Sequence, residues 1–205
     1  PHEVEEYANK LDTSIQPEEI KKRRDMRDVL TFTIDPKDAK DFDDALSFQV
    51  LKNGNYEVGI HIADVSHYVK GGSSLDQEAR DRGTSVYFPR RVVPMLPEKL
   101  SNGLCSLNPG VERLCMTCEM TVGRQGKLLD YRFYPAVMRS HARLTYNKVN
   151  MILEGKGGPD LLKKYSDVIP GLQSLHKLYK DLKLARKKRG VMDFDRLESK
   201  ILFDE

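Results

Sequence analysis

Residues 29–44, VLTFTIDPKDAKDFDD, join an apolar run to five aspartates that fall within ten residues. The run at 29–34 is rich in β-branched and aromatic side chains, which favour a strand. Pro36 biases the residue before it toward an extended conformation, so Asp35 is expected at the strand end. A tight turn after the strand would bring together four carboxylates, those of Asp35, Asp41, Asp43 and Asp44.

Carboxylates at such short range repel one another unless a proton or a hard metal ion lies between them. Mg²⁺ or Mn²⁺ is the natural occupant of a site with only oxygen ligands. A calcium loop of the EF-hand type is excluded, because its sixth position would be Lys40 instead of glycine and its twelfth would be Leu46 instead of glutamate. A solvated acidic turn is the other alternative. The apolar residues interleaved with the acids, such as Ile34 and Phe42, indicate instead a segment folded into an interior.

Residues 33–46, which read T-I-D-P-x-D-A-K-D-F-D-D-A-L, resemble the active-site signature of the ribonuclease II/ribonuclease R (RNB) family of exoribonucleases. The resemblance covers essentially residues 21–205 and is strongest to the bacterial ribonuclease R branch. Five further stretches resemble the same catalytic domain in the same order, namely 58–69, 83–89, 94–107, 140–146 and 189–190.

The resemblance implies roles for seven residues. Asp35 and Asp44 would be direct metal ligands, Asp41 would complete the ligand set, and Asp43 would position metal and attacking water. Asp38 belongs to the motif without being one of the catalytic four. The aromatic residues expected to contact RNA are Tyr87 as a clamp on the terminal base, Phe194 as a second stacking ring, and Tyr146 near the ribose.

The activity that the resemblance implies is processive 3′-to-5′ hydrolysis of single-stranded RNA to nucleoside 5′-monophosphates. Mg²⁺ would be the cofactor, with Mn²⁺ as a substitute, and the 3′ end of RNA the partner. No nucleotide or nicotinamide cofactor is expected, and the oligomeric state stays open. The alternative is a non-catalytic RNA- or metal-binding module, either a degenerate relative or an inert fragment. The presence of all four aspartates favours the enzyme.

The patterns predict an α+β fold with a mostly antiparallel sheet or partial barrel and flanking helices. Residues 1–20 are expected to form a lead-in helix or linker, and residues 21–205 the N-terminal portion of the catalytic domain. The domain's C-terminal part and the flanking OB-type domains of the family would be absent, which makes the chain a fragment. Expected strands are 45–51, 56–65, 116–122 and 128–137; expected helices are 75–82, 146–153 and 171–189; and 88–97 is expected to be an ordered loop.

Composition and cysteine usage bear on the compartment. With 205 residues, 32% of them charged, and no apolar run of membrane-spanning length, the chain is expected to be globular and not membrane-embedded. Cys115 and Cys118 lie three apart in the alternating run 114–122, which indicates a strand, and so face opposite sides; this suits neither a disulfide nor a zinc site. Reduced thiols and a cytoplasmic location are therefore expected.

The net charge of +3 is unevenly distributed. Residues 28–70 carry eight acids and four bases, whereas 171–190 carry seven bases and one acid. RNA contact by residues 183–189 and an ordinary solvated helix face both fit the basic run. His61 and His67, expected on one face of a strand, are favoured as structural residues over a general acid and base.

Overall fold

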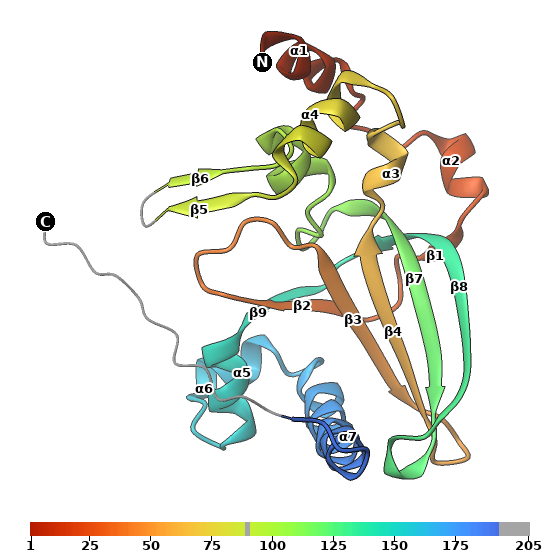
Figure 1. Ribbon diagram of the computed structural model, residues 1–205. Helices are drawn as coiled ribbons and strands as arrows, with labels where there is room; N and C mark the ends of the chain where they lie inside the picture. The colour runs from red at the N-terminus through yellow and green to blue at the C-terminus, as the bar shows by residue number, and fades with distance from the viewer. Residues whose placement is uncertain (89–90, 193–205) are drawn as a thin grey trace, which may run out of the picture.

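The computed structural model describes residues 1–88 and 91–192. A seven-stranded sheet forms the centre of this part of the chain (Figure 1). In spatial order its strands are β1 (Arg24–Met26), β8 (Leu128–Arg139), β7 (Glu112–Val122), β4 (Tyr56–Ala63), β3 (Asp44–Val50), β2 (Thr31–Asp35) and β9 (Ala142–Thr145). The helices are α1 (His2–Lys10), α2 (Pro17–Lys21), α3 (Val65–Tyr68), α4 (Ser74–Arg82), the π-helix η1 (Lys99–Leu104), the short 3₁₀ turn η2 (Arg124–Gly126), α5 (Tyr146–Leu153), α6 (Pro159–Lys164) and α7 (Ile169–Lys188). A separate hairpin consists of β5 (Val86–Phe88) and β6 (Arg91–Val93).

The sheet is mainly antiparallel and open. The central strands from β8 to β2 alternate in direction, and the two parallel pairings lie at the edges, where β1 joins β8 and β9 joins β2. The edge strands β1 and β9 do not pair with each other in the described residues. The predicted α+β fold with a mostly antiparallel sheet is confirmed, and the sheet does not close into a barrel.

The β3–β4 hairpin has the position that its turn sequence predicts. The two strands pair from Asp44 opposite Ile62 to Val50 opposite Tyr56. Gly54 in the connecting turn has φ +80°, a left-handed conformation that glycine adopts without a steric penalty. The tight turn sets the register of the whole hairpin and thereby places Asp44 at its open end.

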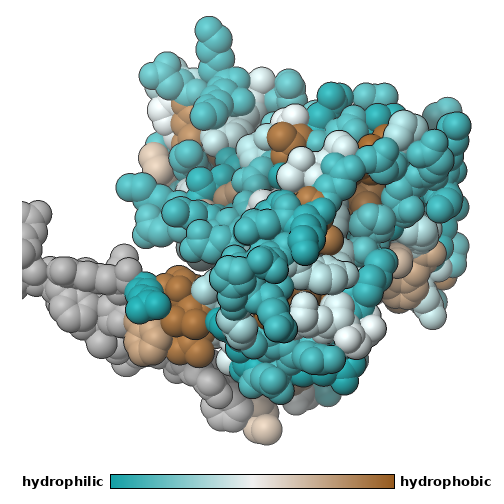
Figure 2. Space-filling model, turned by 90° about the horizontal axis from the view of Figure 1, so that it is seen from above, coloured by the Kyte–Doolittle hydropathy of each residue, from teal (hydrophilic) through white to brown (hydrophobic). Residues whose placement is uncertain are grey.

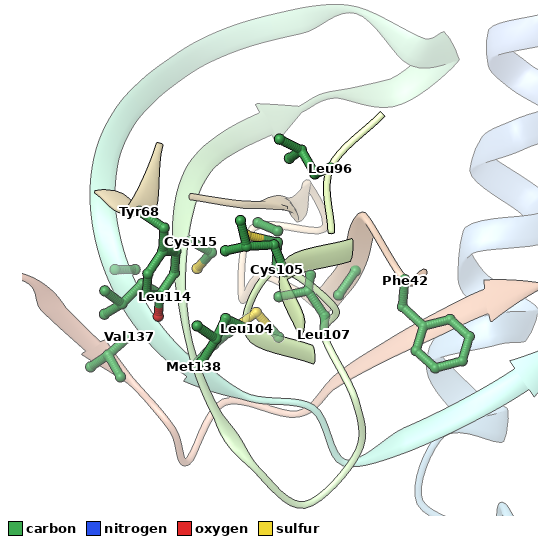
Figure 3. Packing of buried hydrophobic residues seen from close by; sticks show 14 of the residues in the cluster. Phe42, Tyr68, Leu96, Leu104, Cys105, Leu107, Leu114, Cys115, Val137 and Met138 are labelled. Carbon is green, nitrogen blue, oxygen red and sulfur yellow. The ribbon is translucent and has the colours of Figure 1, made fainter. Parts of the chain in front are cut away.

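Apolar side chains are buried on both faces of the sheet. One cluster receives residues from α1, α4 and η1 and includes the fully buried Leu107 and Leu114 (Figure 3). On the other face α5, α6 and α7 cover Phe32 and its neighbours (Figure 1). Alternate residues of a strand point to opposite faces, so β4 contributes Ala63 to the first cluster and Val58 to the cluster under α7.

The surface seen from above is mostly hydrophilic, with apolar side chains in small separate groups (Figure 2). No helix of the described residues combines the length and the apolar character that a membrane crossing requires. All three cysteines are free thiols; Cys105 and Cys115 are buried, and Cys118 is half-buried.

Three local expectations differ from the structure. The strand expected over 56–65 ends at Ala63, because Asp64 caps α3 by accepting a hydrogen bond from the backbone N–H of His67. The loop expected at 88–97 contains part of the β5–β6 hairpin. The separate helix α6 lies between the two helices that were expected near the end of the chain.

Candidate functional site

The acidic loop, residues 36–43, connects β2 to β3, with Asp35 ending the first strand and Asp44 beginning the second. These strands pair at only two positions, Thr31 with Ser47 and Phe32 with Leu46. Beyond those pairs the strands separate and leave space for the loop. Residues 31–35 form the strand for the reason seen in the sequence, an apolar β-branched run that ends at a proline.

Hydrogen bonds from a distant segment hold the second half of the loop. Ser106 accepts from the backbone N–H of Phe42 at 3.0 Å, and its hydroxyl donates to the carbonyl oxygen of Lys40 at 2.8 Å. The carbonyl oxygen of Phe42 accepts from the N–H of Leu107 at 2.9 Å. The Phe42 side chain is 3% exposed and lies at one margin of the core cluster in Figure 3. The buried ring therefore anchors the loop between Asp41 and Asp43.

The carboxylates of the loop destabilise one another's charged forms. Burial raises the pKa of Asp35, and the charges of Asp44 and Asp41 raise it further. Asp43 reaches solvent, yet desolvation by surrounding protein atoms raises its pKa, and the other three aspartates add to the shift. Oδ2 of Asp35 is buried and has no hydrogen-bond partner within the described residues. A cation at this point would reduce the repulsion among the carboxylates and would give Oδ2 of Asp35 a partner.

The four aspartates fit a divalent cation in type and in charge, since Mg²⁺ and Mn²⁺ prefer carboxylate oxygens. The charges of Asp41 and Asp44 are near enough to raise the pKa of Asp35 and of Asp43. Across residues 1–88 and 91–192, however, no three acidic, histidine or cysteine side chains converge on a single point. The structure thus brings the four aspartates to one loop but does not show a complete coordination site among the described residues.

A pocket of about 650 Å³ opens beside the loop and is lined by Asp35, Asp41, Tyr87, Val92 and Asn102. Its walls come from β2, the acidic loop, the β5–β6 hairpin and η1. A larger hollow of about 830 Å³, between α1 and β6, is lined by none of the four aspartates. The smaller pocket therefore combines two of the four aspartates, Asp35 and Asp41, and their neighbour Asp38 with an aromatic surface, while Asp43 and Asp44 do not line it.

Tyr87 is the aromatic residue of this pocket. Its side chain is 67% exposed, so it is not core packing, and its hydroxyl donates to Oδ2 of Asp41 at 3.2 Å. Desolvation and the charge of Asp41 raise the pKa of Tyr87, which keeps the phenol protonated as a donor. The ring is presented to solvent next to the acids, the position that a stacking platform needs.

Of the other residues predicted for the site, those within the described residues do not line this pocket. Tyr146 begins α5 with 60% of its surface exposed, and the preceding residue Thr145 pairs with Asp35. Phe194 lies outside the described residues. The basic run at 183–189 follows Leu182, which packs against Gly126 at the turn after β7. That turn is at the end of the sheet opposite the aspartates.

The histidines have structural surroundings. His61 is fully buried, with Nδ1 2.9 Å from the Thr117 hydroxyl and Nε2 3.0 Å from the Ser47 hydroxyl. His67 lies in α3 and not on the strand with His61, contrary to expectation. Asp64 accepts from Nη2 of Arg23 at 2.7 Å, in addition to capping α3.

Sequence reasoning attached no role to two residues that organise the loop, Ser106 and Arg143. Both lie in stretches that carried the family resemblance, 94–107 and 140–146. Their position in those motifs was the available signal. Their contacts with the loop depend on segments 64 and more than 100 residues away, which no local pattern reveals.

The family model described as "RNB domain" matches residues 23–205. The chain belongs to the RNB domain family. Ribonuclease R of Vibrio cholerae is 53% identical over 205 residues, and that of Escherichia coli K12 is 52% identical over the same length. In both cases all of this chain aligns with 25% of the relative, so the chain spans about a quarter of the length of these curated relatives.

Solved structures agree with this RNB assignment. The RNase R of Mycoplasma genitalium in complex with ribose-methylated single-stranded RNA superposes with a TM-score of 0.90 at 38% identity, over 98% of this chain and 31% of that one. Yeast Ssd1, described as a pseudonuclease, superposes with a TM-score of 0.68 at 22% identity, over 85% of this chain and 21% of that one. The second likeness concerns the fold alone, and it means that the RNB fold by itself does not establish catalysis.

Proposed function

We propose that this chain is the catalytic portion of a metal-dependent exoribonuclease that degrades single-stranded RNA from its 3′ end and releases nucleoside 5′-monophosphates. The observation that supports the proposal is that Asp35, Asp41 and the exposed ring of Tyr87 line one pocket, with Asp43 and Asp44 near enough to interact electrostatically with Asp35. The sequence identity to ribonuclease R supports the same reaction class. A cytoplasmic location belongs to the proposal, because the three cysteines are free thiols.

In this proposal the aspartates hold the cation and the reacting water. Asp35 and Asp44, at the facing ends of β2 and β3, are the direct ligands, and Asp41 completes the set. Asp43 orients the metal and the attacking water, for which its solvent-facing carboxylate is suited. Bound Mg²⁺, or Mn²⁺ in its place, would supply the positive charge that activates water and stabilises the departing 3′ oxygen.

Tyr87 would hold the terminal nucleotide without reading its sequence. Every base offers a π face, and stacking on an aromatic ring contributes ~1 to 3 kcal/mol per base. The hydroxyl of Tyr87 is already held by Asp41, so the ring has a defined orientation before RNA arrives. Sequence-independent stacking next to the aspartates suits an enzyme that removes one nucleotide after another.

A non-catalytic RNA- or metal-binding module is the second candidate. Two observations favour it: the acids do not converge on one point in the described residues, and a pseudonuclease shares the fold. The two candidates differ in what Asp43 does. In the enzyme Asp43 takes part in the reaction, whereas in a binding module its loss changes no turnover.

The deciding experiment follows mononucleotide release from 3′-labelled single-stranded RNA by the full-length protein, with and without Mg²⁺. Asp43→Asn should lower the rate at least ~10²-fold and leave RNA affinity nearly unchanged, because phosphate contacts elsewhere dominate binding. Asp38→Asn is the matched control: it removes the same charge from the same loop, outside the predicted ligand set, and should keep most of the rate. Retention of more than about a tenth of the rate by Asp43→Asn would contradict the role of Asp43.

A further inference from the structure

Arg143 is a cation beside the acidic loop that pairs with none of the loop's carboxylates in the described part of the chain. Its Nη2 nitrogen donates instead to backbone carbonyl oxygens of the loop. These are the oxygens of Pro36 at 3.3 Å, Lys37 at 2.6 Å and Ala39 at 3.1 Å. The guanidinium therefore gathers the first half of the loop and leaves the aspartate oxygens free for another cation.

The same guanidinium also contacts the second half of the loop. Its central carbon lies 4.8 Å from the centre of the Phe42 ring, a cation–π distance. Phe42 is buried and stands between Asp41 and Asp43. One side chain thus contacts the loop before Asp41 through hydrogen bonds and after it through an aromatic face.

The backbone of Arg143 is itself firmly placed. Arg143 lies in β9 and pairs with Thr33 of β2, two residues before Asp35. Its carbonyl oxygen accepts from the Tyr165 hydroxyl at 3.0 Å, and Tyr165 is buried in the cluster under the C-terminal helices. The backbone that carries the guanidinium is therefore held by the sheet and by the helical layer at once.

The loop has a physical need for such a residue. Its carboxylates repel one another, and β2 and β3 stop pairing several residues before it. A loop with that charge would open if nothing opposed the repulsion. Arg143 opposes it in two ways, because its charge is attractive to Asp35 and its hydrogen bonds tie three carbonyl groups together.

We propose that Arg143 is a positioning residue that keeps the acidic loop folded around the cation site without neutralising its ligands. The inference rests on the proposed function, since it concerns the same aspartates. It goes further by assigning the loop's shape to a residue of β9 that is not itself a ligand. Arg143 acts before any cation is bound, so its effect is measurable on the metal-free protein.

The test compares Arg143→Met, Arg143→Lys and wild type in the full-length protein, with Arg139→Met as control. Arg139 is a half-exposed arginine at the end of β8, the strand that precedes β9 in the chain; its side chain lies 3.8 Å from Asp28 and makes no hydrogen bond or ion pair with the loop in the described residues. The first readout is amide hydrogen exchange without metal. Loss of several hydrogen bonds should speed exchange of the amides at 37–42 about tenfold in Arg143→Met, with β4 and β7 unchanged.

The second readout is Mn²⁺ affinity, measured by the loss of the free-ion electron paramagnetic resonance signal. Arg143→Met should bind Mn²⁺ about tenfold more weakly, because the carboxylates spread apart before the ion arrives. Arg143→Lys should lie in between, because it keeps the charge and loses the planar guanidinium that contacts both the carbonyl oxygens and the Phe42 ring. Arg139→Met should match wild type in both measurements.

The outcomes separate this inference from the proposed function. If wild type binds Mn²⁺ and Arg143→Met equals it in both affinity and loop exchange, the positioning role is wrong while the metal site stands. If wild type binds no Mn²⁺, the proposed metal site fails, and the loop exchange of Arg143→Met still decides whether Arg143 shapes the loop. If Arg143→Met also loses protection in β4 and β7, the substitution has disturbed the whole sheet, and Arg143→Lys then decides. Loop exchange and Mn²⁺ affinity equal to wild type in Arg143→Lys would overturn the inference.

Discussion

Replacing His61 should change how the stability of this protein depends on pH. His61 is fully buried in β4, between the hydroxyls of Thr117 and Ser47. Burial lowers the pKa of His61 to about 4, from an ordinary value of 6.5. The folded protein therefore keeps this imidazole neutral at pH values where the unfolded chain would protonate it.

The sign and size of the effect follow from proton linkage. Between pH 6.5 and about 4 the unfolded state binds a proton at His61 that the folded state does not, so the free energy of unfolding decreases as the pH decreases. One pKa unit corresponds to about 1.4 kcal/mol, so His61 should account for a loss of about 2 kcal/mol between pH 7 and pH 5. Such a loss is a large part of the stability of a single domain.

The assay is urea unfolding of wild type and His61→Gln at pH 7, 6 and 5. Glutamine retains a donor and an acceptor and does not titrate. The variant should be less stable at pH 7, because it fits the two hydroxyls less well, and should lose about 2 kcal/mol less than wild type on going to pH 5. The carboxylates common to both proteins cancel in that difference. Equal pH dependence in the two proteins would refute the reasoning.

Three further predictions concern the site and the thiols. In the full-length protein, Tyr87→Ala should leave a longer final oligonucleotide on a sequencing gel, because losing ~1 to 3 kcal/mol of stacking releases short substrates sooner. Tyr87→Phe keeps the ring and should leave the wild-type product length. An unchanged product length for Tyr87→Ala would exclude the clamp. A thiol reagent at pH 8 should label Cys118 first, because burial raises the pKa of Cys105 to about 12 and that of Cys115 to about 11. Peptide mass spectrometry measures the order of labelling, and earlier labelling of Cys105 would contradict this prediction. Residues 1–205 should hydrolyse labelled RNA far more slowly than the full-length protein, because this chain aligns with only a quarter of the length of the ribonuclease R relatives. Comparable turnover would show that this chain suffices.

Local patterns in the sequence predicted much of the fold. The apolar run at 29–34 and the Asn53-Gly54 turn predicted β2 and the β3–β4 hairpin, because strand propensity and turn chemistry act within a few residues. Four aspartates at close spacing on such a frame indicated a cation site from their mutual repulsion alone. The nucleotide-binding role of Tyr87 came from the family resemblance, and its exposure beside Asp41 is a finding of the structure.

Tertiary structure decided what holds those aspartates. Ser106 and Arg143 reach the acidic loop only because long connections fold back on it, and β9 joins β2 across more than 100 residues of chain. The pairing of β4 with β7 places the buried His61 beside Thr117, and the contact of Leu182 with Gly126 places the start of the basic run at the end of the sheet opposite the acids. Contacts of this kind depend on closing large loops and on the packing of whole layers, which local periodicity does not encode. The sequence alone thus predicted which acids form the site, and the folded chain decided which distant residues contact the loop that carries them.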